Sequence, residues 1–269
     1  MFTRSIYIVA PAALCLVSAF EVFAQSPLSI SWPTVKKAPA DEVAVKDNFP
    51  IVSQPQRPPE MSRSDRKLIE PKREDIARFR ELLSRDGYGI AKILNLSCGA
   101  DSPMVIDADG CADSIPGHGA DYSFRTGGHS LPEFCDIKLK QGRFISGSIM
   151  TQGLIARLGE IDLLRVDPGR VEVKYLAAFV PAESLAGAQK QTSLINRGIW
   201  NDGHFYSGSV EIKENQTYVL RSIAYRIKGY IADKRRDIIV AFQVVRQDED
   251  GNVTLVWKEL QNKESPRLK

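Results

Sequence analysis

Alternation of apolar and polar side chains is clearest in the last third of the chain, where it predicts β-strands. Residues 238–245 place apolar side chains at alternate positions on one face, at Ile238, Val240, Phe242 and Val244. The opposite face of this segment is also mostly apolar, which is typical of a central strand that is covered on both sides. The turn-forming residues 248–252 follow, and residues 253–260 resume the alternation. The segment therefore predicts a β-hairpin.

Further segments have the alternation or the β-branched and aromatic content of strands. Residues 206–213 alternate strictly and predict one strand with one wet face, and a turn at 214–216 leads into a strand over 217–227. The other predicted strands cover residues 90–96, 103–106, 121–125, 136–140, 143–150, 153–158 and 171–179.

Two segments have the three- and four-residue spacing of amphipathic helices. Between Pro71 and Gly87, one face carries Ile76, Phe79 and Leu83. Between Pro181 and Gly198, one face carries Leu185, Ala188, Thr192 and Ile195. Proline suits the start of a helix and glycine its end. About two helices among eight to ten strands predict an α+β fold, mostly an antiparallel β-sheet that is either curved or folded into a sandwich.

The first 24 residues have the pattern of a secretory signal peptide. Arg4 is the only charged residue before an uncharged, mainly apolar run over 5–20. Val22 and Ala24 place compact residues at the third and first positions before a cut after Ala24. A membrane anchor needs about 20 apolar residues, and this run is shorter and contains Pro11. We therefore expect a protein that is exported to the periplasm or the extracellular space.

The segment that follows the predicted cut has a different composition from the rest of the chain. Seven of the 15 prolines lie in residues 25–60, which show little apolar periodicity. Proline fixes φ and removes a backbone donor, so this segment is expected to be an extended linker or arm. A single α+β domain over residues 61–269 completes the predicted organisation.

Composition and charge limit the classes of partner. Hydrophobic residues make up 43% of the chain and charged residues 26%, which suits a globular domain with a buried core. The net charge of +3 is too small to predict a nucleic-acid partner, which a concentrated basic face would indicate. Since no second apolar segment is long enough to span a bilayer, no stable membrane insertion is expected after cleavage. The partner is expected to be a protein or a small molecule.

Three cysteines remain after the predicted cleavage, and an exported protein is free to form disulfides. Cys98 and Cys111 bracket a segment that ends in a turn, so they are the preferred disulfide pair. Pairing of Cys111 with Cys135 is the alternative, because spacing alone does not determine connectivity.

The sharpest candidate for catalysis is the segment Gly128 to Pro132. Its Gly-His-Ser order resembles the nucleophile elbow of α/β-hydrolases, in which a tight strand-to-helix turn exposes the serine. Pro132 stands where the second glycine of that motif belongs, and no alternating strand–helix series surrounds it. A hydrolase that uses Ser130 and His129 is therefore the alternative function, and a surface turn is the simpler interpretation.

No spacing of residues predicts a metal or cofactor site. The three histidines, His118, His129 and His204, form neither of the short zinc motifs. A site that joins His118 and His129 to Asp107 or Asp109 is the remaining metal alternative. The acidic loops near Asp107 and at 248–252 lack the first and last ligands of an EF-hand and are expected to be turns. We expect no cofactor and assign no catalytic or metal-binding residue.

The function that these observations favour is a non-enzymatic, exported binding module or a structural module of the envelope or extracellular space. The alternative is a secreted hydrolase that uses Ser130 and His129 or a loop metal. The two differ in whether a deep pocket brings Ser130, or His118 with the aspartates, against other titratable groups.

Overall fold

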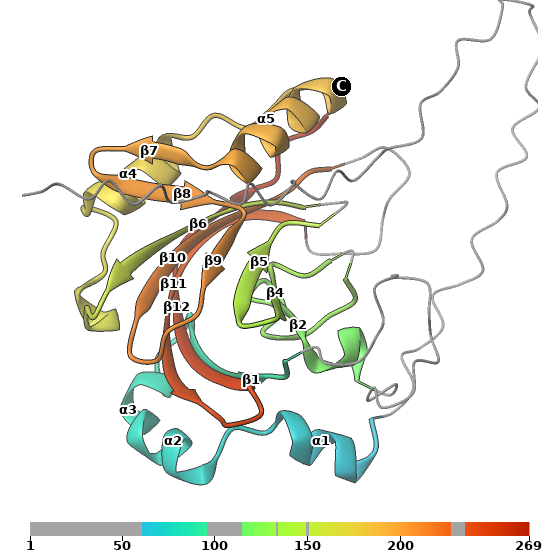
Figure 1. Ribbon diagram of the computed structural model, residues 1–269, viewed down its shortest axis with the longest axis vertical. Coiled ribbons are helices and arrows are strands. Elements are labelled where there is room, and N and C mark those ends of the chain that lie inside the picture. Colours follow the sequence, from blue (N-terminus) through green and yellow to red (C-terminus); the bar gives the residue numbers. More distant parts are fainter. Residues whose placement is uncertain (1–60, 96–114, 133, 149–150, 227–234, 269) are drawn as a thin grey trace, which may run out of the picture. The chain divides into compact units, whose positions relative to one another are not determined.

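A computed structural model of the chain describes residues 61–95, 115–132, 134–148, 151–226 and 235–268, and its strands form two antiparallel sheets (Figure 1). In order across the large sheet, the strands are β1 (Tyr88–Ile93), β12 (Val253–Glu264), β11 (Arg236–Gln247), β10 (Thr217–Ala224), β6 (Thr151–Gly159), β8 (His204–Ser207) and β7 (Ile199–Asn201). Across the small sheet they are β3 (Gly128–His129), β2 (Asp121–Ser123), β4 (Ile137–Lys140), β5 (Arg143–Ser146) and β9 (Ser209–Glu211). The predicted α+β class with mostly antiparallel sheet is confirmed.

An aromatic core fills the space between the two sheets. The ring of Phe242 on β11 stacks with that of Tyr218 at 5.3 Å between centroids and meets Phe144 of the small sheet edge-on. Phe124 stacks with Phe242 from the small-sheet side at 5.6 Å. Because β11 also buries its other face, it is covered on both sides, as its two apolar faces predict.

Helical residues, among them Leu82, Leu176 and Ile195, pack on the outer face of the large sheet and complete a second apolar layer. The helices are α1 (Arg63–Ile69), α2 (Arg73–Arg78), α3 (Arg80–Leu83), α4 (Val171–Ala178) and α5 (Leu185–Arg197), with 3₁₀ turns η1 (Pro116–Gly119) and η2 (Leu163–Arg165). The predicted helix over 71–87 is interrupted at Phe79, which separates α2 from α3. The predicted second helix is confirmed as α5, which Ser184 caps through its hydroxyl.

The predicted strand over 171–179 is wrong, because this segment forms α4. The guanidinium of Arg221 on β10 donates to the carbonyls of Leu176 and Phe179 at the end of this helix, at 2.6 and 2.5 Å. Asp237 on β11 holds the same guanidinium through two hydrogen bonds. A buried cation at a helix C-terminus satisfies carbonyls that the helix itself leaves without donors. This tertiary contact outweighs the local β-propensity of Val171 and Val173.

The predicted single strand over 206–213 is wrong in one respect, because it is broken at Gly208. Its first half is β8 in the large sheet and its second half is β9 in the small sheet. The neighbouring β5 and β6 change sheets in the same place, so a two-stranded ribbon bends from one sheet into the other. We call this bend the corner; Ser146 fixes it by donating its backbone N–H to the Gly208 carbonyl at 2.8 Å.

Several predictions fall outside the described residues. These are the signal peptide over 1–24, the linker over 25–60, the strand over 103–106, and the candidate disulfide of Cys98 and Cys111. Cys135, the third cysteine of the predicted mature chain, is a buried free thiol. In the described part of the chain, none of the helices is long and apolar enough to cross a membrane.

Candidate functional site

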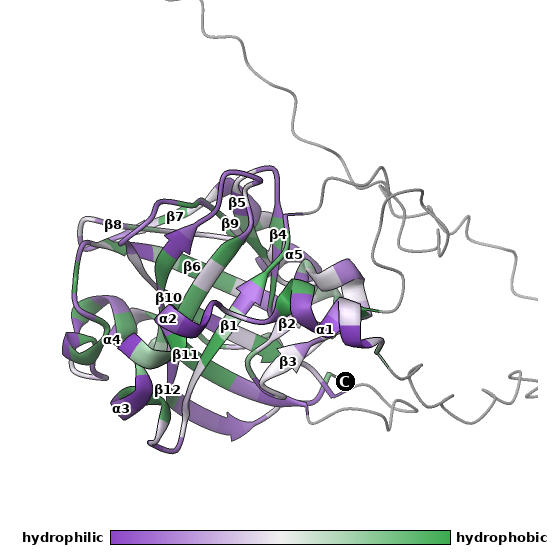
Figure 2. Ribbon diagram, turned by 90° about the horizontal axis from the view of Figure 1, so that it is seen from below, coloured by the Kyte–Doolittle hydropathy of each residue, from purple (hydrophilic) through white to green (hydrophobic). Residues whose placement is uncertain are grey.

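At the side of the sandwich opposite the corner, the sheets end in two edge strands, β1 and β3, and a cleft of about 310 Å³ lies between them. Helix α1 lies beside both strands in the view of Figure 2. The residues that line the cleft are Met61, Ile69, Pro71, Ile90, Ala91, Lys92, Tyr122, Gly127, Gly128 and His129. With about 310 Å³, this cleft has a volume at the lower end of the range for small-ligand sites.

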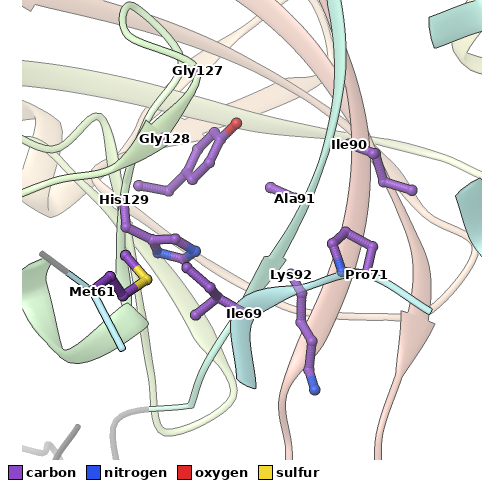
Figure 3. A pocket seen from close by; sticks show the side chains of 10 residues that line it. Met61, Ile69, Pro71, Ile90, Ala91, Lys92, Gly127, Gly128 and His129 are labelled. Atoms are coloured by element: carbon purple, nitrogen blue, oxygen red, sulfur yellow. The ribbon is translucent and has the colours of Figure 1, made fainter. Parts of the chain in front are cut away.

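The β1 wall consists mostly of backbone. In Figure 3, the side chains of Ile90 and Lys92 point away from His129. The Gly87 carbonyl accepts from the Glu259 N–H of the neighbouring β12. Hydrogen-bonded pairs alternate along an antiparallel ladder, so Gly89, Ala91 and Ile93 bond to β12, and the backbone groups of the residues between them point outward. Ile90 and Lys92 therefore present their N–H and C=O groups to the cleft side.

The β3 wall consists of two glycines and one imidazole. A Cβ atom at Gly127 or Gly128 would meet no atom within 4 Å, so the space beside this backbone is open. His129 pairs with Tyr122 across the β2–β3 ladder, and their rings meet edge-on at 5.7 Å. The cleft thus has an open backbone on one side and an aromatic floor that is fixed by the small sheet.

The third wall comes from the start of the described chain. Ser62 caps α1 by accepting from the Asp65 N–H at 3.1 Å, and Met61 immediately precedes this cap. Ile69 is the last residue of α1, and Pro71 follows it. Met61, just before α1, and Ile69, at its end, both line the cleft.

Burial lowers the pKa of the His129 imidazole below its usual value, while the backbone carbonyls of Asp121 and Lys92 oppose this shift. The imidazole is therefore neutral at pH 7 and carries both a donor and an acceptor nitrogen. In the described part of the structure, the buried Nδ1 of His129 has no hydrogen-bond partner. The wall of the cleft thus contains a neutral imidazole.

Tyr122 links the cleft to the aromatic core. Its hydroxyl accepts a hydrogen bond from the Trp257 Nε1–H at 3.2 Å. Burial is the main cause that raises the pKa of Tyr122 to about 12, so the phenol stays protonated at neutral pH. Trp257 in turn lies within 2.6 Å of the position that a Cβ atom at Gly89 would take, so β1 can pass this indole only with glycine at that position.

Ser130 and His129, the predicted catalytic pair, are neighbours in the sequence, but their side chains do not interact with each other. The Ser130 hydroxyl donates to the Leu131 carbonyl at 3.3 Å, while its backbone N–H donates to the Asp121 carbonyl. No hydrogen bond between Ser130 and His129 is present among the residues described. The segment begins with the two-residue edge strand β3, and the next element among the described residues is the strand β4, so the strand-to-helix context of a nucleophile elbow is missing here. The hydrolase remains a prediction.

The other histidines lie in different parts of the fold. His118 is in η1 with a left-handed φ of 51°, and His204 lies on β8, where its Nε2 is 3.8 Å from the buried Glu172. Asp107 and Asp109, the proposed acidic partners of His118, lie outside the described residues. Within the described ranges, no group of three or more His, Cys, Asp or Glu side chains is arranged to hold a metal ion.

Sequence reasoning singled out His129 but missed the rest of the cleft. The walls come from three separated parts of the chain, 61–71, 90–92 and 122–129, and most of the lining residues are ordinary apolar side chains or glycines. The one available signal was Gly127-Gly128 beside a histidine, since a glycine in or next to a strand suggests close approach of another chain or ligand.

Comparison of the chain with protein-family models, with curated proteins and with solved structures found no match.

Proposed function

We propose that this chain is an exported binding module and that the cleft between β1 and β3 holds its ligand. One observation carries the proposal: the two sheets separate at this side and leave a cleft of about 310 Å³ with apolar walls and a neutral imidazole. Export is supported by the signal-peptide pattern of residues 1–24. Edge strands at such an opening offer backbone groups that a central strand has already used.

The test uses Trp257 as an internal reporter, because its indole contacts the cleft residue Tyr122. A variant with Trp32→Phe and Trp200→Phe leaves Trp257 as the single tryptophan of the chain. The probe is anilinonaphthalene sulfonate, which joins an apolar ring system to an anionic group. We expect saturable energy transfer from Trp257 to the bound probe.

Two aspartate substitutions locate the bound probe. Met61→Asp is made in the variant that retains only Trp257, and it places a charge in the apolar wall. It is expected to weaken binding of the probe at least about tenfold, since burying an unpaired charge is costly. The control is Leu185→Asp, because Leu185 is exposed, apolar and also at a helix N-terminus, where an aspartate is tolerated. Equal loss of binding in both variants, or no saturable transfer at all, would contradict the proposal.

The hydrolase alternative is tested on the same protein. Ser130→Ala abolishes any turnover of a p-nitrophenyl ester in which Ser130 is the nucleophile, whereas a binding module retains its probe affinity in this variant. Turnover that is lost with Ser130→Ala would favour the alternative over the binding module.

A further inference from the structure

We propose that the ligand of the cleft is an extended, acidic polypeptide segment that adds as a strand to β1. This inference rests on the proposed function, because it assigns a chemical class of ligand to the same cleft. Strand addition gives affinity through main-chain hydrogen bonds and selectivity through the side chains that point into flanking pockets. Three features of the cleft carry the assignment.

The first feature is the outward edge of β1. The backbone N–H and C=O of Ile90 point away from β12, by the alternation that the Gly87 carbonyl establishes. Further along the same edge, the Leu94 N–H donates to the Gly119 carbonyl at 2.9 Å, which confirms the direction of the outward groups. Among the described residues, no hydrogen bond is made to the outward backbone groups of Ile90.

The second feature is the space on the other side of this edge. The Gly127 and Gly128 backbone lines the cleft without side chains, and the positions of their missing Cβ atoms are open. A polypeptide backbone can therefore approach both walls closely. The side chain of Ala91, which lines the cleft, is only a methyl group. It therefore leaves room for every second side chain of an added strand.

The third feature is charge. Residues 61–73, of which Met61, Ile69 and Pro71 line the cleft, carry five basic and two acidic side chains, a net charge of +3. Lys72 is already paired with Asp248 at 2.9 Å. The other four basic side chains are exposed and have no ion-pair partner in the described part of the chain: Arg63, Arg66, Lys67 and Arg73. The positive charge of this neighbouring segment favours an acidic ligand over a neutral or basic one.

The binding probe is a fluorescein-labelled hexapeptide of alternating glutamate and valine, added to the full chain and followed by fluorescence anisotropy. Three competitors define the chemistry: the same peptide with N-methylated backbone amides, a lysine–valine peptide of equal length, and a 12-nucleotide oligothymidylate. We expect each to compete at least about tenfold more weakly than the unlabelled glutamate–valine peptide. The first lacks the backbone N–H donors, the second lacks the negative charge, and the third lacks the polypeptide backbone.

The protein variants separate backbone pairing from packing. Ile90→Pro removes the outward N–H without removing a bond to β12, and an edge strand tolerates proline at such a position. Ile90→Ala loses the same packing of the isoleucine side chain but keeps the N–H. We expect Ile90→Pro to bind the peptide at least about tenfold more weakly than Ile90→Ala, and the double variant Arg63→Glu/Arg66→Glu to lose a further share of affinity and most of its salt dependence.

Hydrogen exchange gives a second measurement on the unaltered chain, where the Ile90 amide is expected to become protected when the peptide binds. Equal affinity of Ile90→Pro and Ile90→Ala together with an unprotected Ile90 amide would overturn strand addition. Equal binding of the oligothymidylate would overturn the peptide class. If anilinonaphthalene sulfonate still binds and still responds to Met61→Asp, only the peptide inference fails; if neither probe binds, the proposed function fails with it.

Discussion

The two sheets meet in different ways at the two sides of the sandwich. At the corner, β5 continues toward β6 and β8 continues into β9, so the chain itself crosses between the sheets. At the cleft, none of the described strands crosses between the sheets, and β1 and β3 approach each other as separate edges. There the contact is made by the hydrogen bond from Leu94 to Gly119 and by the His129 imidazole beside Lys92.

This difference assigns different physical roles to the two sides. The corner needs close backbone approach: a Cβ atom at Gly153 would lie 2.5 Å from the Cβ of Ser146, whereas one at Gly128 in the cleft would meet nothing. Where the strands cross between the sheets, no strand edge is left unused. Where the sheets end in separate edge strands, unpaired backbone N–H and C=O groups remain that can bind a ligand. The fold therefore combines a tight side that contributes stability with an open side, where we propose that a ligand binds.

The largest expected effect concerns the polar contact that joins the sheets between these two sides. Asp136 is fully buried and accepts from Arg125 of the small-sheet side and from Ser222 on β10 of the large sheet. Asp136→Ala leaves the Arg125 cation buried without its partner, so we expect a loss of about 3–5 kcal/mol in the free energy of unfolding. Urea denaturation measures this loss.

Ser222→Ala is the matched control for that experiment. It removes one hydrogen bond to the same carboxylate and is expected to cost about 1 kcal/mol. A smaller loss in Asp136→Ala than in Ser222→Ala would show that the corner alone holds the two sheets together and that the buried ion pair contributes little.

The second expected effect compares the two sides directly through their glycines. Gly153→Ala introduces a methyl group into the crowded corner, and overpacking of this kind costs about 1–3 kcal/mol. Gly128→Ala introduces the same methyl group into open space, where a change within about 0.5 kcal/mol is expected. Thermal or urea denaturation of the two variants checks the difference; equal stability would mean that the corner relaxes as easily as the open edge.

The sequence correctly predicted elements whose burial can be read from their own pattern of apolar and polar residues. The two apolar faces of 238–245 indicated a strand covered on both sides, and β11 has that position. The segment 171–179 was predicted wrongly because its environment is set elsewhere, by Arg221 on β10 and Asp237 on β11. The corner was missed for a similar reason, since the alternation in 206–213 continues through Gly208 although the strand changes sheets there.

The cleft was even less predictable. Its walls depend on where α1, β1 and β3 come together, and that depends on how the two sheets pack, which periodicity within one segment does not record. His129 was noticed only as part of a Gly-His-Ser motif, and the structure instead shows its imidazole beside the carbonyls of Lys92 and Asp121. The residue was therefore found from the sequence, but its surroundings came from the fold.

The smallest expected effect concerns the pH dependence of the open side. Burial lowers the pKa of His129 in the folded state, whereas the unfolded chain has the ordinary value of about 6.5. The unfolded state therefore binds more protons as the pH falls below about 6.5, so the contribution of this site to stability is present above that pH and is lost on acidification toward the folded-state pKa.

His129→Phe keeps a ring in the cleft wall but does not titrate. Urea denaturation between about pH 7.5 and pH 5 should show a smaller loss of stability for this variant than for the unaltered chain, because His118 and His204 are common to both. Parallel stability curves would mean that the His129 imidazole is as well solvated as in the unfolded chain, and that the cleft wall is more open to water than its burial indicates.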